Sequence, residues 1–105
     1  MMESPEIELL RKRIDGIDTQ ISDLMAQRLD AVREISSVKL SYGLPISDPE
    51  REEAVVEKYR RLARHNGMSQ DISEQVCRLL ISESLMLQQS LAGDTHTPSD
   101  DESEE

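Results

Sequence analysis

The chain has 105 residues, which is enough for one domain. It contains no Phe, no Trp and only two Tyr. Because β-sandwiches and barrels depend on aromatic and β-branched residues, this composition argues against them and favours an all-α fold. The hydrophobic content of 36% is low for a monomeric core, and small chains commonly compensate by oligomerisation.

The net charge of −10 is concentrated at one end of the chain. Residues 94–105 contain six acids and no Lys or Arg, so residues 1–93 carry only −4. That balance disfavours nucleic-acid binding, which needs a basic face. The one basic cluster, Arg60, Arg61 and Arg64, falls in the last turn of an expected helix, and we interpret it as favourable interaction with the helix dipole.

The single cysteine and the N-terminal residues limit the class of protein further. Cys77 has no second cysteine for an internal disulfide and cannot form a structural zinc site alone, so we expect a small buried hydrophobic residue. The N-terminus MMESPEIELL is acidic and lacks an apolar signal region, and no apolar run reaches membrane-spanning length. We therefore expect a cytoplasmic protein without membrane contact.

The first expected helix begins after Ser4, with Pro5 at its first position, and runs to about Ser41 before the stop signal YGLP. Its apolar stripe follows steps of four and three. The stripe comprises Leu10, Ile14, Ile17, Ile21, Leu24, Arg28, Ala31, Ile35 and Val38. A helix this long cannot bury its whole length against two shorter helices, so a second copy of the chain is the expected partner.

Two shorter helices are expected to follow. The second has Asp48 as N-cap and Pro49 at its first position, and ends at Asn66-Gly67. The third begins near Ser69 or Asp71 and continues to about Leu91. It is apolar almost all round, which predicts the most buried helix of the three. We expect a helical domain over residues 1–93 and a disordered acidic tail over residues 94–105.

Arg28 is a charge on an otherwise apolar stripe. A buried guanidinium without an anionic partner costs several kcal/mol, so an anion from another helix or from a ligand should meet it. Lys39 lies eleven residues later, about 20° around the helix and roughly 16 Å along it, so both cations share a face. Arg11 lies roughly 42 Å from Lys39 along the same helix and can join such a site only from an antiparallel second chain.

Polar residues also lie on expected inner faces of the other helices. Ser84 and Gln88 are one turn apart in an apolar stretch, and a buried amide can donate to a ligand oxygen. Asp48 and Glu52 are one turn apart beside Arg51, and an inward Glu52 can accept a hydrogen bond from a substrate hydroxyl.

Each of these positions has a structural explanation as well. Arg11, Arg51 and Glu52 can be solvated surface charges, and Lys39 can complement the dipole at a helix C-terminus. Asp48 can act only as an N-cap, and Ser84 can bond to the carbonyl four residues before it. The combination of cations, amide and hydroxyl on three inner faces favours an anion-binding site.

These residues and their spacing resemble the all-helical class of chorismate mutases from about Leu10 to Leu91. The similar segments are LLRKRIDGIDTQISDLMAQR, VKLSYGLPISDPERE and LLISESLMLQQSL. The most specific part is K-x5-P-[IV]-x-D-x-x-R-E, which begins at Lys39, joined to the distant S-x3-Q of Ser84 and Gln88.

The resemblance implies an intertwined homodimer that converts chorismate to prephenate by a [3,3] pericyclic rearrangement, without metal or cofactor. It implies that Arg28, and Arg11 from the other subunit, hold the two substrate carboxylates, with Ser84 assisting one. Lys39 and Gln88 would donate to the ether oxygen of the breaking bond. Glu52 and the backbone near Asp48 would hold the ring hydroxyl, with Arg51 as a supporting charge.

Further expectations concern pH, domain content and rival functions. Because position 88 is Gln rather than Glu, we expect activity that does not require acidic pH. No dehydratase or dehydrogenase domain follows, which predicts a stand-alone mutase in aromatic amino acid biosynthesis. Two alternatives remain open: an isochorismate-pyruvate lyase of the same fold, and a non-enzymatic helical dimerisation module in which Arg28 pairs with a buried acid.

Overall fold

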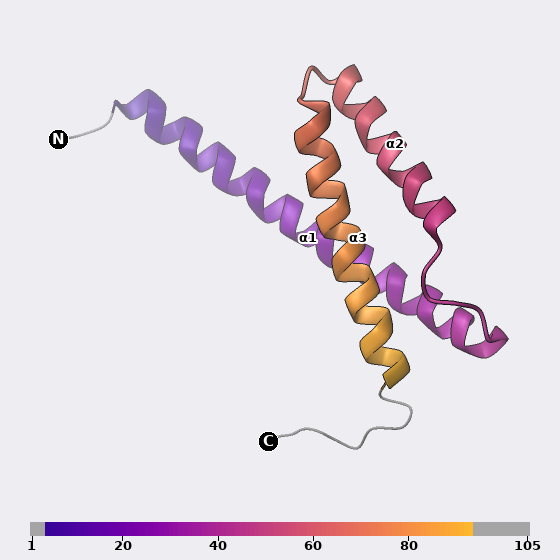
Figure 1. Ribbon diagram of the computed structural model, residues 1–105. Helices are drawn as coiled ribbons and strands as arrows, with labels where there is room; N and C mark the ends of the chain where they lie inside the picture. The colour runs from indigo at the N-terminus through magenta and orange to yellow at the C-terminus, as the bar shows by residue number, and fades with distance from the viewer. Residues whose placement is uncertain (1–3, 94–105) are drawn as a thin grey trace, which may run out of the picture. The chain divides into compact units, whose positions relative to one another are not determined.

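Three α-helices account for most of residues 4–93, the part of the chain that the computed structural model describes. They are α1 (Pro5–Tyr42), α2 (Pro49–His65) and α3 (Gln70–Gly93) (Figure 1). Residues 4–93 contain no β-strand. The expected all-α fold with a long first helix is therefore confirmed, whereas the expected tail at residues 94–105 lies outside the described residues.

The chain divides into two compact units within α1, between Ala31 and Val32. In the first unit, Ser4 caps the start of α1: its Oγ accepts from the backbone N–H of Ile7 at 3.1 Å, and its carbonyl accepts from that of Glu8 at 3.1 Å. These bonds satisfy amides that the first helical turn leaves without partners.

The apolar stripe of α1 is exposed in the single chain. Its large apolar members in the first unit are 44–62% exposed. These are Leu10, Ile14, Ile17, Ile21 and Leu24. In the second unit Ile35 and Val38 are also exposed, and the buried positions of α1 are Val32 and Ser36. The chain by itself thus leaves the predicted stripe uncovered.

In the second unit, α2 and α3 pack side by side in opposite directions (Figure 1). Val56 and Ala63 of α2 and Cys77 of α3 are the buried apolar residues of this pair. Cys77 is 0% exposed, which confirms it as a small core residue.

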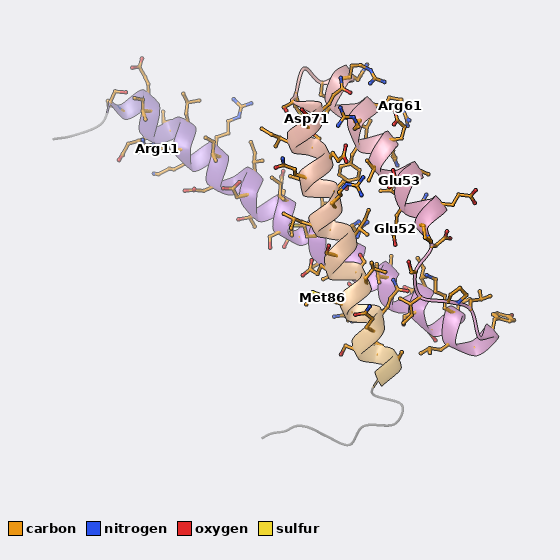
Figure 2. The ribbon with its side chains drawn as sticks, in the orientation of Figure 1. Arg11, Glu52, Glu53, Arg61, Asp71 and Met86 are labelled. Atoms are coloured by element: carbon orange, nitrogen blue, oxygen red, sulfur yellow. The ribbon has the colours of Figure 1, made fainter. Side chains whose placement is uncertain are left out.

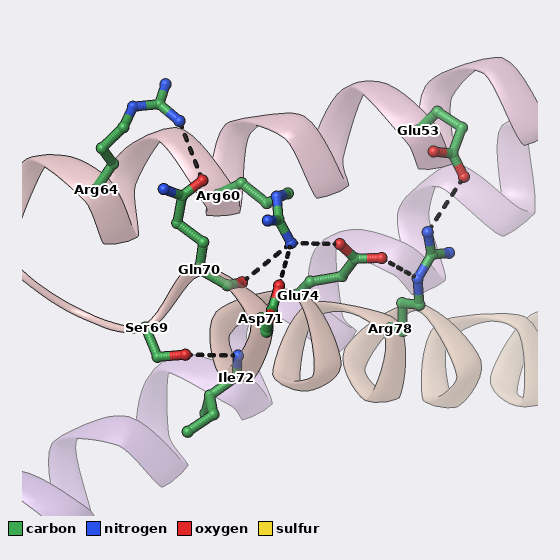
Figure 3. A network of polar contacts seen from close by, with 9 residues as sticks. All are labelled: Glu53, Arg60, Arg64, Ser69, Gln70, Asp71, Ile72, Glu74 and Arg78. Atoms are coloured by element: carbon green, nitrogen blue, oxygen red, sulfur yellow. Dashed lines mark hydrogen bonds and ion pairs between the residues drawn. The ribbon is translucent and has the colours of Figure 1, made fainter.

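An ion-pair network joins the same two helices (Figure 3). Arg60 donates to Asp71 at 3.1 Å and to Glu74 at 2.8 Å, and Arg78 pairs with Glu74 at 2.8 Å and Glu53 at 3.5 Å. The hydrogen bond donated by Arg78, and to a smaller extent the one donated by Arg60, lowers the pKa of Glu74.

The helix-dipole interpretation of the basic cluster was therefore incomplete. Arg60 also donates to the carbonyl of Gln70, and Arg64 donates to the side-chain oxygen of Gln70 at 3.1 Å. These arginines tie α2 to the start of α3, a role that depends on tertiary packing and not on position within α2 alone.

Among the described helices α3 has the most buried residues, which confirms the expected ranking, although its buried face is narrower than its apolar sequence suggests. Its buried residues are Ser73, Cys77, Ser84 and Gln88, and three of these four are polar. On its outer side the large apolar residues Ile72, Leu79 and Met86 are 62–71% exposed, whereas Leu80, Ile81, Leu85 and Leu87 are half-buried. The inner face of α3 thus carries polar groups toward the end of the helix where a site was expected.

Candidate functional site

Lys39 connects three separate segments of the second unit. Its Nζ donates to the carbonyl of Ile46 at 2.6 Å and to Oε1 of Gln88 at 3.2 Å. The half-buried ammonium therefore links the end of α1, the connection to α2, and α3. Among the described residues these two acceptors account for two of its three N–H groups, which leaves one to donate to a ligand.

Gln88 is 6% exposed, and its amide is oriented by this contact. Because Oε1 accepts from Lys39, the Nε2 group is the part of the amide that can donate to another molecule. A cation and an amide donor consequently lie side by side, and the donation to a substrate oxygen that the resemblance implies for this pair stays a prediction.

Ser84 lies one turn before Gln88 on the same face of α3 and is 8% exposed. Its hydroxyl donates to the carbonyl of Leu80 at 2.9 Å, which is the structural alternative considered for it. Its expected role toward a substrate carboxylate stays a prediction.

Asp48 begins α2 as the sequence predicted. Its Oδ1 accepts from the backbone N–H of Arg51 at 3.1 Å, and its carbonyl accepts from that of Glu52 at 3.0 Å. Glu52 lies in the first turn of α2 (Figure 2) and is half-buried, whereas Arg51 is exposed. The capping function of Asp48 is confirmed, and the ligand contacts expected of this turn stay predictions.

Arg11 and Arg28 belong to the first compact unit. Arg11 is exposed and Arg28 is half-buried. Lys39, Ser84 and Gln88 all belong to the second unit. That unit therefore contains the expected donors to the ether oxygen, but not the two arginines that we expect to bind carboxylates.

The carbonyl of Ile46 is a participant that sequence reasoning missed. A backbone acceptor carries no residue-type signal, and Ile46 reads only as an apolar residue in a connection. The nearest signal was the turn sequence YGLP, which indicated where the chain reverses but not that the reversed chain would reach the Lys39 ammonium.

Residues 4–93 lack two features that would point to other kinds of function. They contain no cluster of three or more His, Cys, Asp or Glu residues that could hold a metal ion. In the same stretch, no helix combines the length and apolar character needed to span a membrane.

Comparison with known proteins identifies the family. The model of chorismate mutase type II matches residues 10–89, which is most of the chain and includes every site residue discussed above. The chain belongs to this family. The resemblance inferred from its motifs is therefore confirmed.

The chain covers different shares of the individual relatives that it matches. The chain is 42% identical over 79 residues to the T-protein of Enterobacter agglomerans, covering 75% of this chain but only 21% of that protein. It is 31% identical over 86 residues to the chorismate mutase of Methanocaldococcus jannaschii, covering 82% of this chain and 87% of that protein. It is also 26% identical over 83 residues to the 4-amino-4-deoxychorismate mutase of Streptomyces venezuelae, covering 79% of this chain and 81% of that protein.

Proposed function

We propose that this type II chorismate mutase domain converts chorismate to prephenate. One ether C–O bond breaks and one C–C bond forms within a single molecule, so atoms and electrons balance without a cofactor or a co-reactant. The observation that carries the proposal is the Lys39–Gln88 contact of 3.2 Å, which holds a cation and a largely buried amide donor together.

This pair suits the charge that develops during the reaction. The ether oxygen gains negative charge as its bond to carbon breaks, and donors already in place stabilise that charge without reorganisation. Lys39 has one N–H group left for this oxygen, and Nε2 of Gln88 can supply a second donor. Neither group accepts or releases a proton in the reaction, so no general base is required.

The remaining residues would bind the substrate in its reactive conformer. In this proposal Arg28 and Arg11 hold the two carboxylates, since guanidinium groups bind carboxylates with two parallel hydrogen bonds. Ser84 assists one carboxylate, and Glu52 with the backbone at Asp48 receives the ring hydroxyl. Holding a flexible dianion in a compact form lowers the barrier by removing the entropy cost of reaching that form.

A homodimer completes the proposal. Arg11 and Lys39 are separated by 28 residues of one continuous helix, so a small substrate cannot contact both within one chain. The exposed apolar stripe of α1 is a surface on which a second copy would pack in this proposal. Each site would then take Arg11 from the partner subunit.

The direct test is to incubate the purified protein with chorismate and identify the product by chromatography. Formation of prephenate supports the proposal, while release of pyruvate from isochorismate in a parallel reaction would favour the lyase alternative. A third reaction with 4-amino-4-deoxychorismate tests whether the ring substituent near Glu52 is discriminated. Binding without turnover of any of the three would contradict an enzymatic function.

A further inference from the structure

The turn after α1 forms hydrogen bonds with both the backbone carbonyl and the side chain of Lys39. The backbone N–H of Leu44 donates to the Lys39 carbonyl at 2.8 Å, and that of Gly43 donates to the Leu40 carbonyl at 3.4 Å. The Lys39 side chain then donates to the Ile46 carbonyl at 2.6 Å. The conformation of residues 43–46 therefore determines where the ammonium has an acceptor.

Gly43 provides the backbone conformation that this turn requires. Its φ of +65° lies in the left-handed region, where a side chain is strained. A Cβ added there would meet no atom within 4 Å. A larger residue at position 43 would therefore strain the backbone without a steric clash, and the strain can be relieved only by a change in the turn.

We propose that Gly43 is a positioning residue for the mutase reaction, acting through the Ile46 carbonyl on the Lys39 ammonium. This inference rests on the proposed function. If the turn relaxes away from a positive φ, the carbonyl of Ile46 moves and the ammonium loses its shortest contact. Lys39 then spends less time aligned beside Gln88, and catalysis depends steeply on such alignment.

Gly67 offers a matched control within the same unit. Its φ is +69°, and a Cβ added there also meets nothing within 4 Å. It ends α2 with the same pattern of bonds, from the N–H of Met68 to the Ala63 carbonyl at 2.8 Å and from its own N–H to the Arg64 carbonyl at 3.5 Å. Gly67→Ala thus introduces the same kind of strain at a turn that does not contact Lys39.

The experiment compares kcat for Gly43→Ala, Gly67→Ala and Gly43→Asn in the full chain, at a temperature where thermal melts show every variant folded. We expect Gly43→Ala to lower kcat by about 10- to 100-fold with a small change in KM, and Gly67→Ala to leave kcat within about twofold while lowering Tm similarly. Asn tolerates positive φ better than Ala, so Gly43→Asn should restore most of the lost kcat.

A second set of variants tests whether Gly43 affects kcat through Lys39. In a Lys39→Ala background, Gly43→Ala should lower kcat no further, because the group that it positions is gone. An equal loss in both backgrounds, or equal losses for Gly43→Ala and Gly67→Ala, would overturn the inference.

NMR separates this inference from the proposed function. The ammonium resonance of Lys39, observed in ¹⁵N-lysine-labelled protein, should shift in Gly43→Ala and stay in place in Gly67→Ala. If the wild-type chain makes no prephenate yet shows these shifts, the catalytic function fails while the positioning effect stands. If it makes prephenate and Gly43→Ala shifts neither the resonance nor kcat, only the positioning role fails.

Discussion

Replacing Gln88 by Glu changes one functional group at the centre of the candidate site. The side chain keeps nearly the same size and shape, and it keeps an oxygen where Oε1 accepts from Lys39 at 3.2 Å. The Nε2 donor is replaced by a carboxylate oxygen, which can donate only when it is protonated. The substitution therefore tests donation by Gln88 without opening a cavity at this buried position.

The structure indicates that Gln88→Glu should lower activity much more than stability. A carboxylate 3.2 Å from the Lys39 ammonium gains about 5 kcal/mol of attraction at an effective dielectric constant of 20. Burying that carboxylate costs several kcal/mol, which offsets most of the gain. Loss of one donor to a developing oxyanion, in contrast, typically lowers kcat by about 10² to 10³.

The assay is chorismate consumption between pH 5 and pH 8. The wild-type rate should not require acidic pH, because an amide does not titrate. Gln88→Glu should be slow at pH 8 and should recover by up to about tenfold per pH unit toward acid, as the introduced carboxyl regains its proton. Gln89→Glu, the same change at the exposed neighbouring position, is the control and should match the wild type. Parallel profiles for Gln88→Glu and the wild type would refute donation by Gln88.

Three further predictions test other parts of the account. If Arg28 binds a substrate carboxylate as proposed, Arg28→Ala should lower kcat/KM by about 10² or more while Tm changes little; a large fall in Tm with unchanged kcat/KM would indicate a structural ion pair instead. Asp48→Ala removes the acceptor for the Arg51 N–H and should lower the free energy of unfolding by about 1 kcal/mol in urea titrations; an unchanged midpoint would contradict the cap. Since Arg78 and Arg60 lower the pKa of Glu74, its contribution to stability is present above its ordinary value of 4.5 and is lost as the pH falls through the folded-state pKa. The urea midpoints of the wild type and Glu74→Gln should therefore converge in acid, and a constant gap from pH 7 to pH 3 would contradict this.

The helix ends were predictable from sequence because their signals are local. Pro49 after Asp48 predicted the start of α2, and the structure shows the cap at that residue. Gly43 and Gly67 predicted two helix ends, and both have positive φ. Each signal depends on the conformational limits of one residue or on one side-chain bond to a nearby amide.

Contacts between elements were harder to predict. Periodicity placed Ile35 and Val38 on the stripe of α1, but Val32 and Ser36 are the buried residues there. A repeat of apolar residues shows that a surface should be covered without showing whether the same chain or another copy covers it. The contact from Lys39 to the Ile46 carbonyl was equally unpredictable from the sequence, since any residue type presents the same backbone acceptor.

The most direct test of a site shared between two chains is complementation between Arg11→Ala and Gln88→Ala. Each variant alone should be nearly inactive. In a mixed dimer one site inherits both substitutions, and the other takes intact Gln88 from one chain and intact Arg11 from its partner. After unfolding and refolding at a 1:1 ratio, about half of the dimers are mixed, so about a quarter of the wild-type activity should return. Activity no higher than the average of the two separate variants, in a sample shown to contain mixed dimers, would contradict the shared site.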